Sequence, residues 1–321
     1  MPQSEFDIIK EYFQKQKTVR DDVCLGIGDD AAIITVPQSK QLAIALDTLV
    51  AGVHFPTETS AEDVAYKALA VNLSDLAAMG AEPAWFTLGI TLPESNTDWL
   101  KNFASGLFSL ADQYNVQLIG GDTTQGPLTV TIQVAGLLPE GKALKRDGAN
   151  EGDLIYVTGS LGDAALGLKG LQHPDIYPVT PQLIDKLNRP QPRLEVGHAL
   201  LDIASACIDV SDGLLADLGH ILDSSGVGAS VDRAQLPLSD TLQAQCDKDD
   251  SRYHLALTGG DDYELCFCVS PDRQQDIHTI SNRTGVLITC IGTIEQQPGL
   301  RLHHAGNLID TVTQSGYEHF A

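Results

Sequence analysis

The sequence predicts a two-domain protein of the α/β class (α/β or α+β), with strands and helices mixed in both halves. Its 321 residues exceed the length of one typical domain. Apolar runs with strand character alternate along the chain with runs of helical periodicity. A polar, glycine-bearing loop, GKALKRDGANEGD, separates the two halves. We therefore expect one domain over residues 1–148 and a second over residues 149–321.

The composition argues against several classes of function. The formal net charge of −23 argues against nucleic acid or an anionic membrane as the partner. No apolar run approaches the roughly 20 residues of a membrane span, and the polar, acidic start MPQSEFDIIKEYF resembles neither a signal nor a transit peptide. The six cysteines form no CxxC pair, and Cys266 and Cys268 alternate along an apolar strand. Reduced cysteines in a cytoplasmic protein are expected.

The first elements are a short amphipathic helix over residues 4–14 and the segment LGIGDDAAIITV, a glycine turn that leads into an apolar strand. This segment matches G-x-G-x-x-A, but a dinucleotide-binding motif opens a helix and AAIITV does not. We therefore reject a Rossmann domain. The run QLAIALDTLVAGVHF predicts a strand with Asp47 at its end and a turn that carries His54.

A helix from Ser60 to Gly80 is the element around which the first half is organised. Ser60 and Asp63 have the spacing of an N-terminal cap, and Gly80 stands where a glycine ends a helix. Asp75 lies in the middle of its apolar stripe, where a lone carboxylate is costly. Two interpretations remain open: Asp75 pairs with a buried arginine or caps a backbone donor, or it binds a metal ion.

The remaining elements of the first half are the strand AWFTLGITLP, a helix over residues 96–114, the strand VQLIGGDTTQG ending on Asp122, and the strand LTVTIQVAGLLP. The second half starts with DLIYVTGSLGDAALGLKGL, which predicts strand, glycine turn and helix. In SACIDVSDGLLADLGHIL, a short strand precedes two aspartates and a helix that starts near Ser211 or Asp212. We expect HLALTGGDDYELCFCV to form strand, Gly-Gly-Asp-Asp turn and strand.

Aspartates recur beside glycine or small residues at these expected strand ends and turns. They are Asp29, Asp30, Asp47, Asp122, Asp209, Asp212, Asp261 and Asp262. Any one of them could simply stabilise a turn, but the set also offers hard oxygen ligands for Mg²⁺ or Ca²⁺. The EF-hand pattern is absent, which favours Mg²⁺. Neither a P-loop nor the protein-kinase motifs occur, so metal ions would have to neutralise most phosphate charge.

Motifs along essentially the whole chain resemble the thiamine-monophosphate kinase family. They include GIGDDAA, DTLVAGVHF, AVNLSDLAAMGA, GGDTT, TGSLGDAALGL, DVSDGL, GDDYELCF and the terminal GYEHF. DTLVAGVHF and AVNLSDLAAMGA are specific to this kinase within the wider superfamily of aminoimidazole ribonucleotide synthetase. The resemblance implies a two-domain aminoimidazole ribonucleotide synthetase-like fold, and a homodimer whose N-terminal domains pair their sheets, with ATP bound in a cleft near that interface.

The resemblance also implies roles for individual residues. The Mg²⁺ ligands would be Asp30, Asp47, Asp75, Asp122, Asp209 and Asp212. Nucleotide contacts would come from Gly121, Asp122, Arg146 and Ser211. Contacts to thiamine phosphate would come from His54, Asp261 and Tyr317.

Three positions depart from the family pattern. Ala45 and Leu46 stand where many members have hydroxyl residues, so a metal contact there would need main-chain carbonyls or water. Asp261 replaces a usual glutamate and shortens the reach by one methylene. Tyr317 replaces a frequent tryptophan and keeps a smaller stacking face. These departures concern substrate affinity more than reaction type.

The implied reaction joins two polyanions, ATP and a phosphate monoester. The acceptor oxygen is already ionised near neutral pH, so no catalytic base is expected and the barrier is dominated by repulsion and positioning. We expect direct in-line transfer with several Mg²⁺ ions and no phosphoenzyme. Two alternatives stay open: another ATP-using enzyme of the same superfamily, and a non-catalytic sensor of Mg²⁺ and nucleotide.

Overall fold

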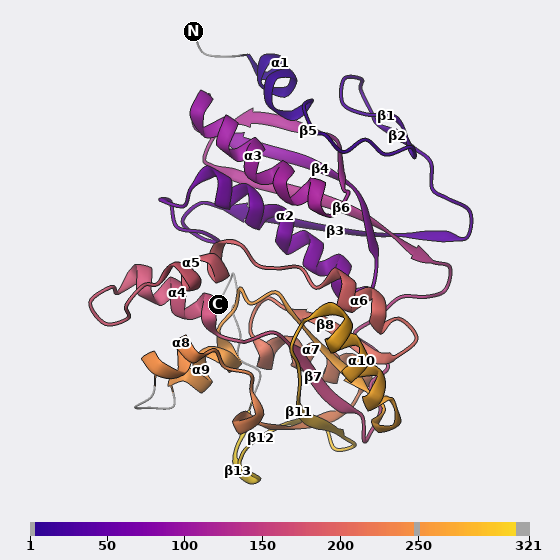
Figure 1. Ribbon diagram of the computed structural model, residues 1–321, viewed down its shortest axis with the longest axis vertical. Helices are drawn as coiled ribbons and strands as arrows, with labels where there is room; N and C mark the ends of the chain where they lie inside the picture. Colours follow the sequence, from indigo (N-terminus) through magenta and orange to yellow (C-terminus); the bar gives the residue numbers. More distant parts are fainter. Residues whose placement is uncertain (1–3, 247–250, 313–321) are drawn as a thin grey trace. The chain divides into compact units, whose positions relative to one another are not determined.

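The computed structural model describes residues 4–246 and 251–312 and divides into two compact units (Figure 1). The first contains residues up to 76 together with residues 81–141, and the second contains residues 77–80 together with residues from 142 onward. Each unit has its own sheet and its own core. The mixed α/β class expected from the sequence is confirmed.

The first unit is built on a four-stranded sheet in the order β3-β6-β4-β5, in which only β4 and β5 are parallel neighbours. Helices α2 and α3 cover one face (Figure 1), where Val130, Ile132 and Val134 of β6 are fully buried. In chain order its elements are α1 Glu5–Ile8, the π-helix η1 Ile9–Phe13, β1 Val23–Leu25, β2 Ile33–Ile34, β3 Lys40–Val50, α2 Ala61–Ala78, β4 Glu82–Leu92, α3 Thr97–Gln113, β5 Gln117–Gln125 and β6 Thr129–Pro139.

Helix α2 confirms the helix predicted from Ser60 to Gly80. The Ser60 hydroxyl accepts a hydrogen bond from the Asp63 N–H at 3.1 Å and donates one to the Asp63 carboxylate at 2.8 Å. Gly80 ends the helix with φ +71°, a conformation that glycine adopts at little cost. The helix is buried on nearly all sides, whereas Asp75 is half-buried.

The second unit is built on a seven-stranded sheet in the order β13-β12-β9-β11-β7-β10-β8. Its strands are β7 Leu154–Thr158, β8 Ala204–Val210, β9 Gly228–Asp232, β10 Glu264–Val269, β11 Ile288–Glu295, β12 Gly299–His304 and β13 Asn307–Val312. Its helices are α4 Asp163–Gln172, α5 Pro181–Asn188, α6 Leu194–Leu200, α7 Leu214–Ser225, η2 Arg233–Gln235, α8 Asp240–Gln245, α9 Ser251–Thr258, η3 Pro271–Arg273 and α10 Gln274–Thr284.

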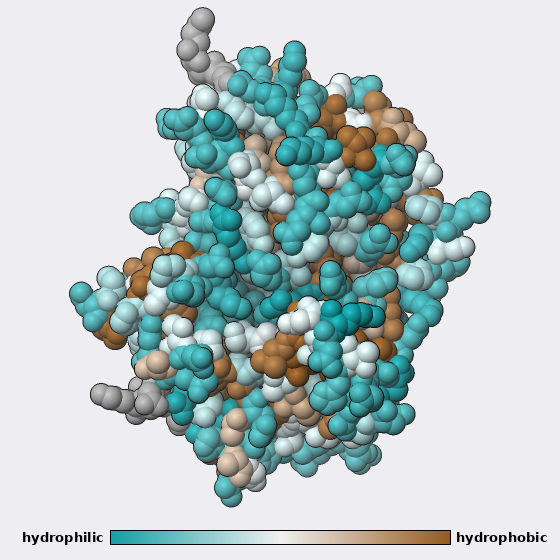
Figure 2. All heavy atoms as spheres, in the orientation of Figure 1, coloured by the Kyte–Doolittle hydropathy of each residue, from teal (hydrophilic) through white to brown (hydrophobic). Residues whose placement is uncertain are grey.

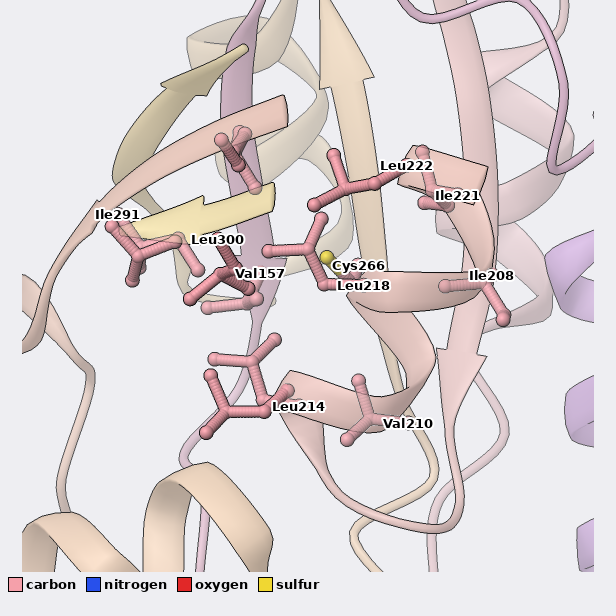
Figure 3. Packing of buried hydrophobic residues seen from close by; sticks show 14 of the residues in the cluster. Val157, Ile208, Val210, Leu214, Leu218, Ile221, Leu222, Cys266, Ile291 and Leu300 are labelled. Carbon is pink, nitrogen blue, oxygen red and sulfur yellow. The ribbon is translucent and has the colours of Figure 1, made fainter. Parts of the chain in front are cut away.

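Helix α7 supplies the centre of the second core. Its residues Leu214, Leu218 and Ile221 pack against strand residues such as Val157 and Cys266 (Figure 3). Cys266 and Cys268 lie in β10 and are buried, and all six cysteines are free, as expected. Hydrophilic side chains dominate the molecular face drawn in Figure 2. Among the described residues, no helix is long and apolar enough to cross a membrane.

Three local expectations were wrong. Asp47 and Asp122 lie inside strands β3 and β5, not at strand ends, because the ladders continue past them to Val50 and Gln125. Residues His254–Thr258 belong to helix α9, since a short apolar run does not distinguish strand from buried helix. Helix α7 begins at Leu214, after Gly213, and not at Ser211 or Asp212.

Candidate functional site

A cavity of about 700 Å³ lies in the first unit between the start of the chain and strand β5. Its walls combine apolar side chains with carboxylates and glycine backbone. The lining includes Phe6, Ile9, Phe13, Leu118, Ile119, Lys10, Gln14, Gly28, Asp29, Asp30, Gly120, Gly121 and Asp122. The structure thus brings together three of the predicted site residues, Asp30, Gly121 and Asp122. An apolar pocket with a few polar groups is the usual form of a small-molecule site.

Glycines bring the backbone close at this cavity. A Cβ on Gly121 would lie 1.9 Å from the Leu88 carbonyl oxygen of the neighbouring strand, so only glycine allows β4 and β5 to approach here. Gly28 has φ +130°, which turns the chain immediately before Asp29 and Asp30. The Asp30 N–H donates to the Asp29 carboxylate at 2.9 Å, and both residues are exposed at this turn.

In the first unit, Asp47 of β3 is hydrogen-bonded to Asn72 of α2, the helix that also carries Asp75. The Asp47 N–H donates to Asn72 Oδ1 at 3.0 Å, and Asn72 Nδ2 donates to the Ala68 carbonyl at 2.9 Å. Asn72 is fully buried, and Asp75 follows it by three residues, one helical turn along the same side. Asp47 thus lies at a contact between β3 and α2, and Asp75 lies about one helical turn from Asn72.

Strand register places Asp47 and Asp122 on opposite faces of the sheet. Asp47 pairs with Ile132, Ile132 with Leu88, and Leu88 with Gly121, so these positions share the face covered by the helices. Asp122 is the next residue and points to the other face. Three strand spacings also separate Asp47 from Asp122, about 14 Å. One Mg²⁺, with ligand distances of about 2.1 Å, cannot bind both carboxylates of the same chain.

His54 is oriented by three hydrogen bonds in the turn after β3. Its Nδ1 accepts from the Val50 N–H at 3.0 Å, its own N–H donates to the Val50 carbonyl at 3.0 Å, and its carbonyl accepts from Lys67 Nζ at 3.3 Å. Because Nδ1 is an acceptor, the neutral ring carries its proton on Nε2. Lys67, which is 1% exposed, was not singled out from the sequence, since a lysine on a helix is ordinarily a surface residue.

In the second unit, Asp209, Ser211 and Asp212 follow one another at the end of β8. The N–H groups of Ser211 and Asp212 donate to Asp217 Oδ2 at 2.9 and 3.1 Å. Asp217 stands in the first turn of α7 and is buried. Its burial, together with the charges of Asp209 and Asp212, raises the pKa of Asp217 to about 7. The sequence offered no signal for Asp217 beyond its place at the start of a helix.

Asp261 lies beside this segment, as the two loops are hydrogen-bonded to each other. The Asp261 N–H donates to the Ser211 carbonyl at 2.9 Å, and the Tyr263 N–H donates to the Val210 carbonyl at 2.8 Å. Asp261 and Tyr263 have φ +68° and +48°, a left-handed backbone that is rare outside glycine. Such strain is typical of functional loops. The structure therefore brings Asp261 to the predicted residues Ser211 and Asp212.

Asp262, next to Asp261, points into the protein. Both of its carboxylate oxygens accept from the Gly162 N–H at 3.0 Å, at the start of α4. Burial raises the pKa of the Asp262 carboxyl group well above its ordinary value, and that hydrogen bond opposes the rise. Both aspartates of GDDYEL are half-buried, and the Asp261 carboxylate accepts from the Tyr263 hydroxyl at 3.3 Å.

The other predicted residues lie elsewhere. Arg146 is exposed in the loop before β7, where its carbonyl accepts from Ser225 Oγ at 3.3 Å. Tyr317 lies outside the described residues. Within residues 4–246 and 251–312, no three His, Cys, Asp or Glu side chains gather closely enough to hold a metal ion. The chemistry of the predicted donor set, six aspartate carboxylates, nonetheless fits Mg²⁺ and not a soft metal.

Two domain families match the chain. AIR synthase related protein, N-terminal domain, matches residues 28–138, and AIR synthase related protein, C-terminal domain, matches residues 150–305. These matches confirm the fold that the motifs implied, one family for each half of the chain.

Known proteins are also similar to this chain over nearly its full length. The chain is 50% identical to a thiamine-monophosphate kinase of Salmonella typhimurium over 99% of this chain and 98% of the relative. A crystal structure of thiamine-monophosphate kinase from Stenotrophomonas maltophilia is similar with a TM-score of 0.87 and 46% identity, covering 96% and 99% of the two chains. The structure of AaThiL complexed with AMPPCP and TMP is similar with a TM-score of 0.77 and 29% identity, covering 98% and 96%. The chain belongs to the thiamine-monophosphate kinase family.

Proposed function

We propose that this protein transfers the γ-phosphoryl group of ATP to the phosphate of thiamine monophosphate, giving thiamine diphosphate and ADP. The observation that carries the proposal is the cavity in the first unit, where Asp30, Gly121 and Asp122 meet an apolar wall. AaThiL, which has a similar fold, was solved with AMPPCP and TMP bound. A triphosphate nucleotide and a thiamine phosphate are the corresponding substrates of this chain.

The nucleotide is bound by Gly121, Asp122, Arg146 and Ser211. Gly121 lets β5 lie close to β4 at the cavity, and the exposed guanidinium of Arg146 can form two hydrogen bonds with a phosphate group. The apolar cavity wall suits a nucleobase. Functionally, residues 1–148 form the domain of the nucleotide cavity and of dimerisation, and residues 149–321 form the domain that adds Ser211 and Asp261.

Several Mg²⁺ ions are held by Asp30, Asp47, Asp75 and Asp122 of the first unit and by Asp209 and Asp212 of the second. When bound, Mg²⁺ neutralises the phosphate oxygens and lowers the repulsion between the two substrates. No side chain of the chain acts as nucleophile or general base, because the acceptor phosphate is already ionised. The protein positions the two substrates and supplies the carboxylates for Mg²⁺, and the phosphoryl group passes directly from ATP to thiamine monophosphate.

His54, Asp261 and Tyr317 contact thiamine monophosphate. Because Val50 holds His54 Nδ1 as an acceptor, the opposite ring nitrogen is a donor suited to a phosphate oxygen. The carboxylate of Asp261 and the ring of Tyr317 suit the cationic thiazolium. All six cysteines are free, which suits a reducing compartment, and we place the reaction in the cytoplasm.

A homodimer is part of the proposal. Asp47 and Asp122 of one chain face away from each other, so a second copy would have to complete a metal site that needs both. Strand β3 is an edge strand of its sheet, and Leu42, Ile44 and Leu46 along it are exposed. An exposed apolar edge strand is a natural pairing surface.

One assay tests the proposal: the protein is incubated with ATP, Mg²⁺ and thiamine monophosphate, and thiamine diphosphate is measured. We expect formation of thiamine diphosphate, its abolition by EDTA, and no label left on the protein from γ-labelled ATP. ATP consumption with another acceptor would indicate a different enzyme of the superfamily. Nucleotide binding without turnover would indicate a sensor. A stable phosphoprotein would exclude direct transfer.

A further inference from the structure

Asp217 makes an unusual pair of contacts at the end of β8. Two consecutive backbone N–H groups, those of Ser211 and Asp212, converge on its single oxygen Oδ2 at 2.9 and 3.1 Å. Hydrogen bonds from backbone N–H to a carboxylate are among the stronger ones in proteins. A single oxygen of Asp217 thus holds the backbone of both residues in place.

The backbone of this segment is constrained from the other side as well. The Ser211 carbonyl accepts from the Asp261 N–H at 2.9 Å, so the amide and the carbonyl of Ser211 are both engaged. Gly213, which follows, has φ +113°, and a Cβ there would lie 2.8 Å from the Thr258 backbone. The conformation of residues 211–213 is therefore set by contacts with α7, with the loop before β10 and with α9.

Asp217 itself has almost no surface for a ligand, being 3% exposed. Ser211 and Asp212 are half-buried, so their side chains are more accessible than the carboxylate that holds their backbone. A role of Asp217 in the reaction must then act through these two residues.

We infer that Asp217 is a positioning residue: it holds Ser211 and Asp212 in the backbone conformation in which they bind the Mg²⁺–nucleotide complex. The inference rests on the nucleotide and metal roles given to Ser211 and Asp212 in the proposed function. It assigns to Asp217 the acceptance of two hydrogen bonds, not a negative charge.

Two substitutions separate these contributions. Asp217→Asn retains one carbonyl oxygen that can accept both N–H groups and removes the charge. Asp217→Leu has a similar size and removes the acceptor. Asp223, exposed on the same helix, provides matched controls as Asp223→Asn and Asp223→Leu. Asp217→Ser is a second acceptor-poor variant in case leucine prevents folding.

The first measurement is independent of activity: hydrogen exchange of the Ser211 and Asp212 amides in the full chain without ligand. We expect Asp217→Leu to speed exchange at these two amides, and Asp217→Asn and both Asp223 variants to leave it unchanged. Equal exchange in all variants overturns the inference. Because no substrate is present, this result does not depend on whether the protein is a kinase.

The second measurement is steady-state kinetics per folded molecule. For Asp217→Leu we expect the KM for Mg²⁺–ATP to rise about tenfold or more, while the KM for thiamine monophosphate changes less than about threefold. Asp217→Asn should stay within about threefold of the parent for both substrates. An asparagine variant as impaired as the leucine variant would assign the effect to charge and overturn the inference.

Two further outcomes are decisive. Failure of both Asp217→Leu and Asp217→Ser to fold would overturn the inference, because Asp217 would then serve the fold of the second unit and not the site. A parent protein without kinase activity, but with faster exchange in Asp217→Leu, would refute the proposed function while retaining the backbone contact.

Discussion

Arg193 and Glu264 form a buried two-pronged ion pair in the second unit. Arg193 Nε donates to Glu264 Oε2 and Nη2 donates to Oε1, each at 2.6 Å, and the Glu264 side chain is only 3% exposed. Thr158 Oγ1 also donates to Oε2 at 2.6 Å and accepts from the Leu265 N–H at 2.8 Å. This network joins the end of β7, the start of β10 and the residue before α6.

Glu264→Gln should therefore destabilise the protein by about 3–5 kcal/mol, because it leaves the Arg193 charge without its buried partner. Denaturant unfolding measures the loss. Glu295→Gln is the matched control: Glu295 pairs with Arg301, but its side chain is 38% exposed. That change should cost at most about 1 kcal/mol. Similar losses in the two variants would contradict the importance of burial.

Asp22 should give the first unit a pH-dependent stability. Burial raises its pKa, but hydrogen bonds from Arg20 and Trp85 outweigh burial and hold the pKa of Asp22 below its ordinary 3.8. The carboxylate then stabilises the folded chain fully above the ordinary pKa, and this contribution is lost as pH falls through the lower folded value.

Asp22→Asn should thus cost about 2 kcal/mol near pH 7 and progressively less as the pH falls below about 4. Unfolding in urea at a series of pH values measures the difference. The exposed neighbour substitution Asp21→Asn should show a small loss at every pH. If the loss of unfolding free energy in Asp22→Asn did not decrease as the pH falls, the assigned ion pair would be excluded.

Gly121 and Gly120 should respond differently to a methyl group. A Cβ on Gly121 would meet the Leu88 carbonyl oxygen at 1.9 Å, whereas a Cβ on Gly120 would meet nothing within 4 Å. Gly121→Ala should force β4 and β5 apart. It should lower the free energy of unfolding by several kcal/mol, roughly the destabilisation that overpacking causes in protein cores. For Gly120→Ala, the free energy of unfolding should stay within about 1 kcal/mol of that of the parent protein. Calorimetry compares them, and equal melts would refute the predicted clash.

Ile44 tests the homodimer. It is 60% exposed on edge strand β3, and Leu287 is also 60% exposed but lies in the second unit, between α10 and β11. Ile44→Lys should place a charge in a paired sheet edge and yield monomers in sedimentation velocity at micromolar concentration, while Leu287→Lys should sediment as the parent does. A parent protein that is monomeric and fully active would contradict the dimer.

Asp75→Asn should separate a metal ligand from a structural carboxylate. As a ligand, Asp75 should be needed for turnover, so kcat per folded molecule should fall by about two orders of magnitude or more, and stabilisation by Mg²⁺–ATP should weaken. Asp98→Asn, an exposed change on α3, should leave both unaltered. If Asp75 were structural, the asparagine variant would lose about 1–5 kcal/mol in EDTA yet keep normal turnover.

The class of each domain and several individual elements follow from local sequence. Ser60 and Asp63 cap the start of α2, and Gly80 follows its end. The Asn96 side chain accepts from the Trp99 N–H at 3.0 Å at the start of α3. Such signals act over three or four residues, so no tertiary contact is needed to recognise them. The DVSDGL and GDDYEL motifs, through their resemblance to the family, likewise indicated Ser211, Asp212 and Asp261 as candidate site residues.

Contacts between distant segments decided the rest. Lys67, Asp217 and Glu264 are buried polar residues whose partners are set by packing. Thr158 and Glu264, for example, are 106 residues apart in sequence. Helix α9 replaced an expected strand because tertiary burial, not the local apolar run, determined its conformation. Strand register alone put Asp47 and Asp122 on opposite sheet faces, since a shift of one residue reverses the direction of a side chain. The sequence by itself indicated the candidate residues for metal and nucleotide binding, and the tertiary structure decided which of them lie together within one unit, because their positions depend on strand register and packing.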